Sequence, residues 1–126
     1  MVETQDMARE LSDLINKNKI YENLMTYCRG QDRKDLERMR ATYWPDATDE
    51  HGNFVAHTAQ EFLDHAVPIL ESMALTTHFL GNVLIDIDGD AAFTESYIQA
   101  FHRMRRADGT RYDHMSSSRF IDRMEL

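Results

Sequence analysis

The chain of 126 residues is poor in cysteine, in positive charge and in long apolar runs, and each shortage argues against a class of protein. The single cysteine, Cys28, cannot form an intrachain disulfide, so we expect a cytoplasmic protein. Its 22 acidic and 14 basic residues give a net charge of −8, which argues against nucleic acid and anionic membrane surfaces as partners. No apolar run approaches the roughly 20 residues that span a bilayer. The acidic, polar segment 1–6 does not resemble a signal peptide.

The length and composition that remain are those of one ordinary globular domain, which we expect to span residues 1–126. Apolar residues at helical spacing predict two N-terminal helices, the second ending at Pro45. Gly30 is the predicted cap of the first helix, and Asp32 is the predicted start of the second. The apolar positions that indicate these helices are Met7, Leu11, Leu14, Ile15, Tyr21, Leu24, Met25, Tyr27 and Cys28, followed by Leu36, Met39 and Tyr43.

The second half of the chain changes from helix to strand. A turn-rich segment, 44–53, has room for a short strand. Thr58 and Glu61 then form a capping box that predicts a helix, which Pro68 should kink or interrupt. Three antiparallel strands are predicted at residues 77–87, 91–104 and 112–124, with turns at 88–90 and 107–110. Helices followed by such a meander favour an α+β fold, in which a bent sheet with helices over its concave face encloses a pocket.

Tyr27, Asp32 and His78 supply the groups needed to move a proton next to a carbonyl. Histidine titrates nearest neutral pH, and a carboxylate beside it fixes its tautomer and raises its basicity. A tyrosine hydroxyl can stabilise a developing oxyanion. Each residue also has a structural interpretation: His78 as a core histidine at the start of a strand, Asp32 as a helix cap, and Tyr27 as a core residue.

Other residue types indicate no metal or organic cofactor. The spacings of His57, His65 and His114 match no common zinc pattern, so we expect these three side chains at the surface and no metal site. The eight methionines are expected to fill irregular gaps in the core, although a lipophilic pocket lined by methionine is an alternative.

Six segments carry a resemblance to a known family: Tyr27–Asp35, Tyr43–Ala47, Asp49–Gly52, Thr77–Asn82, Ala100–Arg103 and Arg119–Arg123. Together they resemble the SnoaL-like branch of the nuclear transport factor 2 superfamily, from about residue 12 onward. The resemblance implies a cone, in which a curved antiparallel sheet wraps a pocket that N-terminal helices close. Characterised relatives include scytalone dehydratase, a bile-acid dehydratase and hexachlorocyclohexane dehydrochlorinase. These enzymes eliminate water or HCl across a carbon–carbon bond without a cofactor.

The resemblance also implies roles for individual residues. In those enzymes the residue matching His78 is the general base, and the residue matching Asp32 pairs with it. Tyr27 matches a pocket tyrosine of the bile-acid enzyme, so we assign catalysis to these three. The predicted substrate-binding residues are His51, His102, Trp44 and Phe54. His51 departs from the family, because the dehydratases carry a second tyrosine at that position.

We therefore expect a cofactor-independent lyase of the dehydratase type. Its substrate would be a medium-sized, apolar cyclic molecule such as a polyketide, steroid or aromatic compound. The alternatives are an isomerase or cyclase that uses the same proton transfer, and a non-catalytic ligand-binding or assembly module resembling an oxygenase small subunit. Members of the family carry one more strand after Arg119–Arg123. Either the sequence is truncated before that strand, or a neighbouring chain covers the sheet edge that this chain would expose, and we expect a homodimer or homotrimer.

Overall fold

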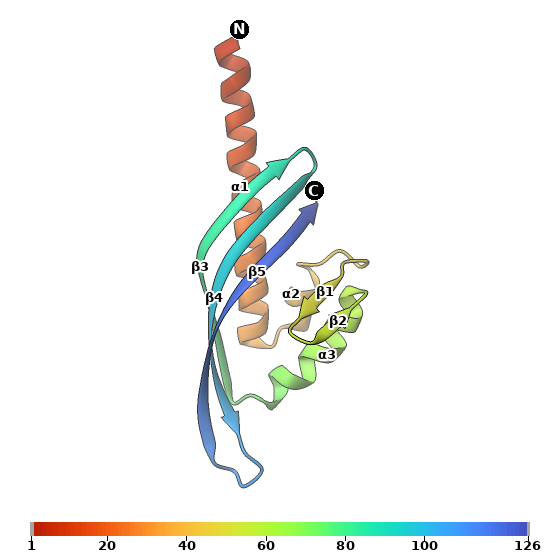
Figure 1. The fold of residues 1–126 in the computed structure, drawn as a ribbon, viewed down its shortest axis with the longest axis vertical. Helices are drawn as coiled ribbons and strands as arrows, with labels where there is room; N and C mark the ends of the chain where they lie inside the picture. Colours follow the sequence, from red (N-terminus) through yellow and green to blue (C-terminus); the bar gives the residue numbers. More distant parts are fainter. Residues whose placement is uncertain (1, 126) are drawn as a thin grey trace.

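The computed structural model describes residues 2–125, with side chains from Thr4 onward, as a long helix, a curved sheet and a layer of smaller elements (Figure 1). The elements in chain order are α1 (Val2–Arg33), α2 (Leu36–Arg40), β1 (Asp49–His51), β2 (Phe54–Ala56), α3 (Ala59–Ser72), β3 (Leu75–Asp88), β4 (Ala91–Arg105) and β5 (Arg111–Glu125). β1 and β2 form a small hairpin, and β3, β4 and β5 form an antiparallel sheet in that order. The predicted α+β class and cone-like curvature are confirmed.

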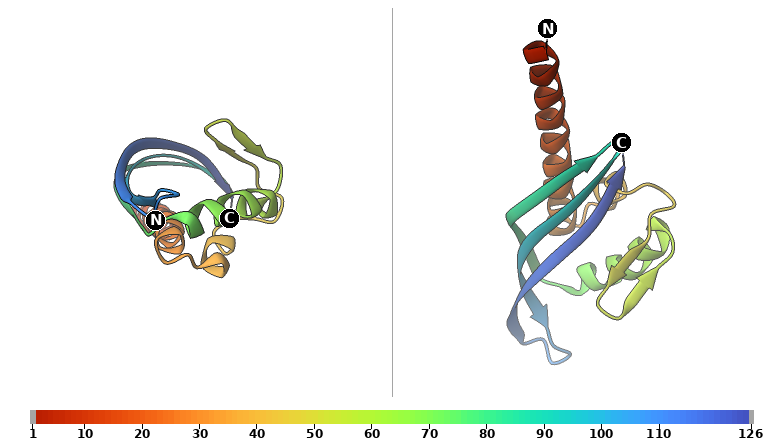
Figure 2. Two further views of the ribbon diagram at one scale, coloured as in Figure 1. Left: turned by 90° about the horizontal axis from the view of Figure 1, so that it is seen from below. Right: turned by 45° about the horizontal axis from the view of Figure 1, so that its top comes forward.

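The three long strands lie where the sequence predicts them. Compared with the prediction, β3 is three residues longer, β4 one residue longer and β5 two residues longer. The predicted turns separate them, and Gly89 and Gly109 take left-handed φ angles of +60° and +85° there, which glycine tolerates best. The register of β3 against β4 shifts between Leu80 and Val83, because β3 carries one more residue than β4 over that stretch. Such a bulge bends a strand. The sheet consequently curves around the helices, as the view from below in Figure 2 shows.

α1 continues without interruption through Gly30, so the predicted cap at Gly30 and helix start at Asp32 are wrong. A Cβ atom at residue 30 would lie 2.7 Å from Cγ of Met39 on α2, so glycine is needed for close packing rather than for a turn. The chain reverses one turn later, at Lys34, whose φ is +55°. Asp35 then caps α2. The extra turn of α1 carries Asp32 on to the sheet.

The capping box at the start of α3 is confirmed. The backbone N–H of Glu61 donates to Oγ1 of Thr58 at 3.2 Å. The carboxylate of Glu61 accepts a hydrogen bond from the backbone N–H of His57 at 2.7 Å, one residue before the expected partner. α3 passes through Pro68 to Ser72, so the proline does not interrupt it.

A hydrophobic core joins α1, α2 and α3 to the hairpin and to the middle of the sheet. Its buried residues are Tyr27, Cys28, Met39, Ala56, Phe62, Leu63, Ala66, Leu70 and Ile98. Two regions extend past this core in opposite directions: the N-terminal half of α1 and the turn between β4 and β5 (Figure 1). The concave face of the sheet therefore continues beyond the core.

Candidate active site

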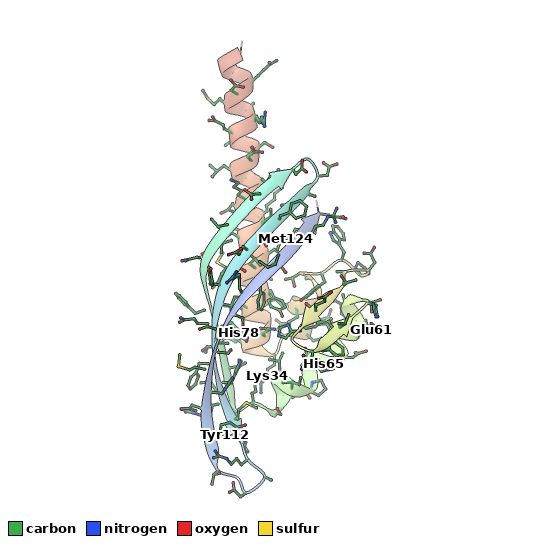
Figure 3. The ribbon with its side chains drawn as sticks, viewed as in Figure 1. Lys34, Glu61, His65, His78, Tyr112 and Met124 are labelled. Atoms are coloured by element: carbon green, nitrogen blue, oxygen red, sulfur yellow. The ribbon has the colours of Figure 1, made fainter. Side chains whose placement is uncertain are left out.

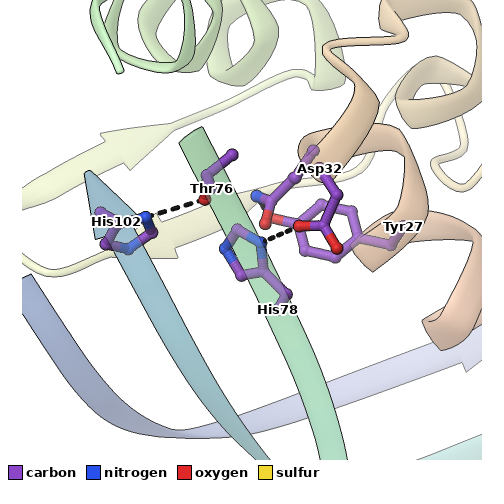
Figure 4. A network of polar contacts seen from close by, with 6 residues as sticks. Tyr27, Asp32, Thr76, His78 and His102 are labelled. Atoms are coloured by element: carbon purple, nitrogen blue, oxygen red, sulfur yellow. Dashed lines mark hydrogen bonds and ion pairs between the residues drawn. The ribbon is translucent and has the colours of Figure 1, made fainter. Parts of the chain in front are cut away.

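His78, which Figure 3 labels on the sheet, and Asp32 are 46 residues apart in sequence and meet in a hydrogen bond of 2.7 Å between Nδ1 and Oδ1 (Figure 4). Asp32 comes from the last turn of α1 and His78 from β3, against which α1 packs. The side chain of His78 is 9% exposed and that of Asp32 is 24% exposed. Because the carboxylate engages Nδ1, Nε2 is the ring nitrogen left to accept a proton. We call His78 and Asp32 the dyad.

Histidines continue from the dyad across the concave face. His102 on β4 pairs directly with Thr76 on β3 and with His114 on β5. Nδ1 of His102 lies 2.8 Å from Oγ1 of Thr76, and its ring centroid lies 5.6 Å from that of His78 (Figure 4). Burial, together with the nearby rings of His78 and His114, lowers the pKa of His102. Neutral His102 can therefore exchange a hydrogen bond with a ligand without adding charge next to the dyad.

His114 is exposed, as the sequence predicts, but it also belongs to this row. Its ring lies parallel to that of His102, with the two planes inclined by 11° and the centroids 6.1 Å apart. The sequence contains a signal for this placement, because pairing across the predicted turn at 107–110 sets residue 102 opposite residue 114. Strand register, rather than metal-ligand spacing in the sequence, brings this histidine to the site.

Tyr27 lies in the core, close to the dyad. Its hydroxyl accepts a hydrogen bond of 2.7 Å from Nε2 of Gln31, the residue before Asp32. Its ring packs against those of Tyr43 and Phe120, with centroids 5.9 and 6.3 Å away. Burial raises the pKa of Tyr27 above its ordinary value of 10.0, so the hydroxyl stays protonated. Tyr27 is thus a core residue whose hydroxyl accepts a hydrogen bond from Gln31, the residue that precedes Asp32 of the dyad.

A second histidine–carboxylate pair lies on β1. Nδ1 of His51 is 3.7 Å from Oδ1 of Asp49, whose other oxygen accepts a 2.9 Å hydrogen bond from the hydroxyl of Tyr43. The half-exposed His51 ring packs against Phe62 of α3 and Phe120 of β5, with centroids 5.7 and 6.0 Å away. Asp49 raises the pKa of His51, and partial burial opposes that shift. A larger fraction of His51 is therefore protonated at a given pH than of an unperturbed histidine, and the protonated ring can serve as a proton donor.

Replacing Asp49 with asparagine should lower the pKa of His51, because the largest cause of the upward shift is removed while burial remains. The sign can also be checked in stability. The shift stabilises the wild type fully below the unfolded histidine pKa of about 6.5, and that stability is lost as pH rises through the folded value. Histidine ring resonances followed by NMR across pH 5–9 measure the pKa directly. The resonance of the exposed His57 is the internal control, and an unchanged His51 titration in the variant would contradict the pairing.

Three buried polar atoms have no hydrogen-bond partner within the described chain: Oε1 of Gln31, Oδ1 of Asp49 and Oγ of Ser96. Ser96 is fully buried on the concave face, where it pairs with Phe120. Leaving a buried polar group unpaired costs about 1–3 kcal/mol. Sequence spacing did not single out any of them, because each is an ordinary helix or strand position until the sheet curves.

Trp44 and Phe54 lie away from the dyad. The side chain of Trp44 is 56% exposed, and its Nε1 lies 3.4 Å from the carbonyl oxygen of Glu125. Phe54 stacks on His65 of α3, with centroids 3.7 Å apart. The structure thus brings His102 next to the dyad and sets His51 on the facing hairpin, whereas Trp44 and Phe54 flank the smaller layer.

Two surface hollows also lie away from the dyad. One lies between α1 and the end of the sheet near the β3–β4 turn. The other lies between α2 and α3. Neither is lined by a residue of the dyad.

In residues 2–125 no helix has the length and apolar character needed to cross a membrane. The same residues contain no group of three or more His, Cys, Asp or Glu side chains placed to hold a metal ion.

Comparison with known proteins gives one family and many structures of the same fold. The family model for the SnoaL-like domain matches residues 12–126. A protein of Novosphingobium aromaticivorans, provisionally named a scytalone dehydratase, superposes with a TM-score of 0.81 at 21% identity, over 90% of this chain and 76% of its own. A hexachlorocyclohexane dehydrochlorinase gives 0.81 at 18% identity, over 93% and 79%. No curated protein sequence matches.

A third similar structure has a different role. It is the beta subunit of a provisionally named aromatic-ring-hydroxylating dioxygenase of Novosphingobium aromaticivorans, with a TM-score of 0.68 at 17% identity, over 91% of this chain and 82% of its own. All three identities are below 25%, so these likenesses establish the fold, and the chemistry has to be argued from the residues of the site.

Proposed function

The chain belongs to the SnoaL-like domain family of the nuclear transport factor 2 superfamily, and from that premise we propose that it is a cofactor-independent lyase of the dehydratase type. The observation that carries the proposal is the 2.7 Å hydrogen bond between His78 and Asp32 on the concave face. A histidine held by a carboxylate is a general base with a fixed tautomer. The likeness to a dehydratase-type protein and to hexachlorocyclohexane dehydrochlorinase favours a medium-sized cyclic substrate, such as a polyketide, steroid or aromatic compound.

The proposed reaction begins with proton abstraction. Nε2 of His78 takes a proton from a carbon next to a carbonyl group, and Asp32 stabilises the imidazolium that forms. The electrons of the broken C–H bond form a carbon–carbon double bond as the β-hydroxyl group leaves. Protonated His51 donates a proton to that leaving group, so the products are an unsaturated carbonyl compound and water. His78 then releases its proton to solvent, and His51 regains one.

Other residues position these groups rather than transfer protons. The hydrogen bond between Gln31 and Tyr27 stabilises the last turn of α1, which carries Asp32. Thr76 orients His102, which binds an oxygen of the substrate next to His78. If the substrate carries no leaving group, the same proton transfer produces isomerisation or cyclisation.

The proposal is tested by looking for proton abstraction itself. Purified protein is incubated in D₂O with a panel of cyclic β-hydroxy ketones and their unsubstituted ketones. Mass spectrometry detects deuterium next to the carbonyl, and ultraviolet absorption detects the conjugated product. We expect exchange or elimination for at least one ring class, well above the background of a His78→Gln variant. Equal rates for the two proteins across the panel would overturn the proposal.

A second candidate function is that of a non-catalytic assembly module. It is favoured by a set of large apolar side chains that the convex face of the sheet exposes. These are Phe79, Leu84, Met115 and Ile121, which are 71%, 69%, 70% and 69% exposed. Patches of this kind often mark protein contacts. This candidate predicts stable association with a different chain and no exchange in D₂O with any member of the panel.

A further inference from the structure

α1 carries two apolar faces, and the domain covers one of them. Ile20, Leu24, Tyr27 and Cys28 face the core and are buried. A second set remains open to solvent: Met7, Leu11, Leu14, Tyr21 and Met25, each between 37% and 65% exposed. At 100° per residue the second set lies about 120° around the helix from the first. Residues 4–12, which include Met7 and Leu11, are exposed throughout, and the N-terminal part of α1 extends past the sheet (Figures 1 and 2).

The exposed face has the spacing of a two-stranded coiled coil. Positions 7, 11, 14, 18, 21 and 25 are separated alternately by four and three residues, which is the a/d repeat of a heptad. We call these six positions the seam. Five of them are the exposed apolar residues, and the sixth is Asn18, at an a position. A single polar asparagine at an a position fixes register and oligomeric state at some cost in stability.

The charges flanking the seam suit a second copy of the same helix. In a parallel pair, each g residue faces the e residue five positions later on the other helix. Lys17 then faces Glu22 of the second copy, and by symmetry the pair forms twice. The next pair toward the N-terminus joins Glu10 and Ile15, so no like charges oppose each other there. Ile15, 47% exposed, widens the apolar contact.

The extended part of α1 also needs a partner on physical grounds. A helix with an exposed apolar face gains most of its stability in water from packing that face. Residues 4–12 of α1 are exposed all round within the described chain. We propose that the seam of α1 pairs in parallel with the seam of a second copy of this chain. This inference does not rest on the proposed lyase function.

The first test measures the mass in solution. Sedimentation equilibrium between 1 and 100 µM should show wild type as a dimer, whereas a Leu11→Asp/Leu14→Asp variant should sediment at the mass of one chain. Arg9→Asp is the matched control, because residue 9 lies on the same exposed stretch of α1 but on the side opposite the seam. It should remain dimeric. A monomeric wild type at 100 µM, or a double variant that still associates, would overturn the proposal. The second outcome would assign association to another surface, such as the convex face of the sheet.

The second test measures orientation. Leu14 occupies a d position, so cysteines at residue 14 of two parallel helices face each other. A Leu14→Cys variant should form a disulfide-linked dimer under mild oxidation, visible by non-reducing electrophoresis. An Arg9→Cys variant should give little of it, and the native Cys28 is buried. A Leu14→Cys protein that keeps the dimer mass without cross-linking would exclude the parallel pairing.

Discussion

Replacement of His78 by glutamine is expected to lower kcat about 10²–10⁴-fold on any compound that the protein dehydrates, because that is the typical contribution of a positioned general base. Glutamine keeps a polar side chain that can bond Asp32, so the fold should survive. The loss should fall on kcat more than on KM, since proton abstraction occurs in the transition state. Steady-state rates on a substrate found by the deuterium screen measure both.

The control for this prediction is His57→Gln, which removes an exposed histidine outside the concave face and should leave the rate unchanged. Circular dichroism and thermal melting should show all these proteins folded. A His78→Gln protein with the wild-type kcat would show that the dyad is not the base.

In the proposed mechanism Asp32 acts through His78, so its substitution should have a distinct kinetic signature. Asp32→Asn keeps the shape of the side chain but removes the charge that orients the ring and stabilises the imidazolium. We expect a fall in kcat of about 10²-fold or more. When two residues act as a unit, the effects of substituting them on kcat are strongly non-additive. The double variant should therefore be no slower than His78→Gln alone, whereas multiplied losses would mean that the two side chains act separately.

The sequence predicts an element of this fold well where neighbouring residues determine it, and poorly where contacts between distant residues determine it. The strands and turns follow from alternation, β-branched residues and glycine, so their bounds are predicted within two residues. The end of α1 is misjudged, because Gly30 looks like a cap in isolation. Its real constraint is the approach of Met39, which arises when α2 folds back on α1. No short sequence pattern indicates that two helices pack closely at a given residue.

The candidate site likewise contains residues that the sequence predicts and residues that it does not. The resemblance to a family names His78 and Asp32, and chain folding over 46 residues brings them to 2.7 Å. Asp49 was not predicted, since its significance comes from two contacts: a hydrogen bond from Tyr43 and the ion pair with His51. Those contacts exist because the β1–β2 hairpin folds over the core. The departure from the family at residue 51 therefore comes with a carboxylate that keeps the imidazole protonated to higher pH.

The core beneath this hairpin carries the largest expected effect on stability. Phe62 on α3 is 1% exposed and packs against Tyr43, His51 and Tyr27, with ring centroids 5.5, 5.7 and 6.5 Å away. Truncation to alanine removes these contacts and leaves a cavity in a close-packed region. We expect Phe62→Ala to lower the free energy of unfolding by about 3–5 kcal/mol. Urea denaturation followed by circular dichroism measures this change as a lower midpoint with a similar slope.

Ile69→Ala on the same helix is the matched control, because Ile69 is 44% exposed and its truncation should change stability by only about 0.5 kcal/mol or less. Phe62→Ala should also broaden the His51 resonances in NMR spectra, since the imidazole loses one of the two rings that hold it. A Phe62→Ala protein as stable as Ile69→Ala would mean that the hairpin does not pack on α3 in solution. His51 would then lose its fixed position on the wall facing the dyad, and the assignment of His51 as the acid would fail with it.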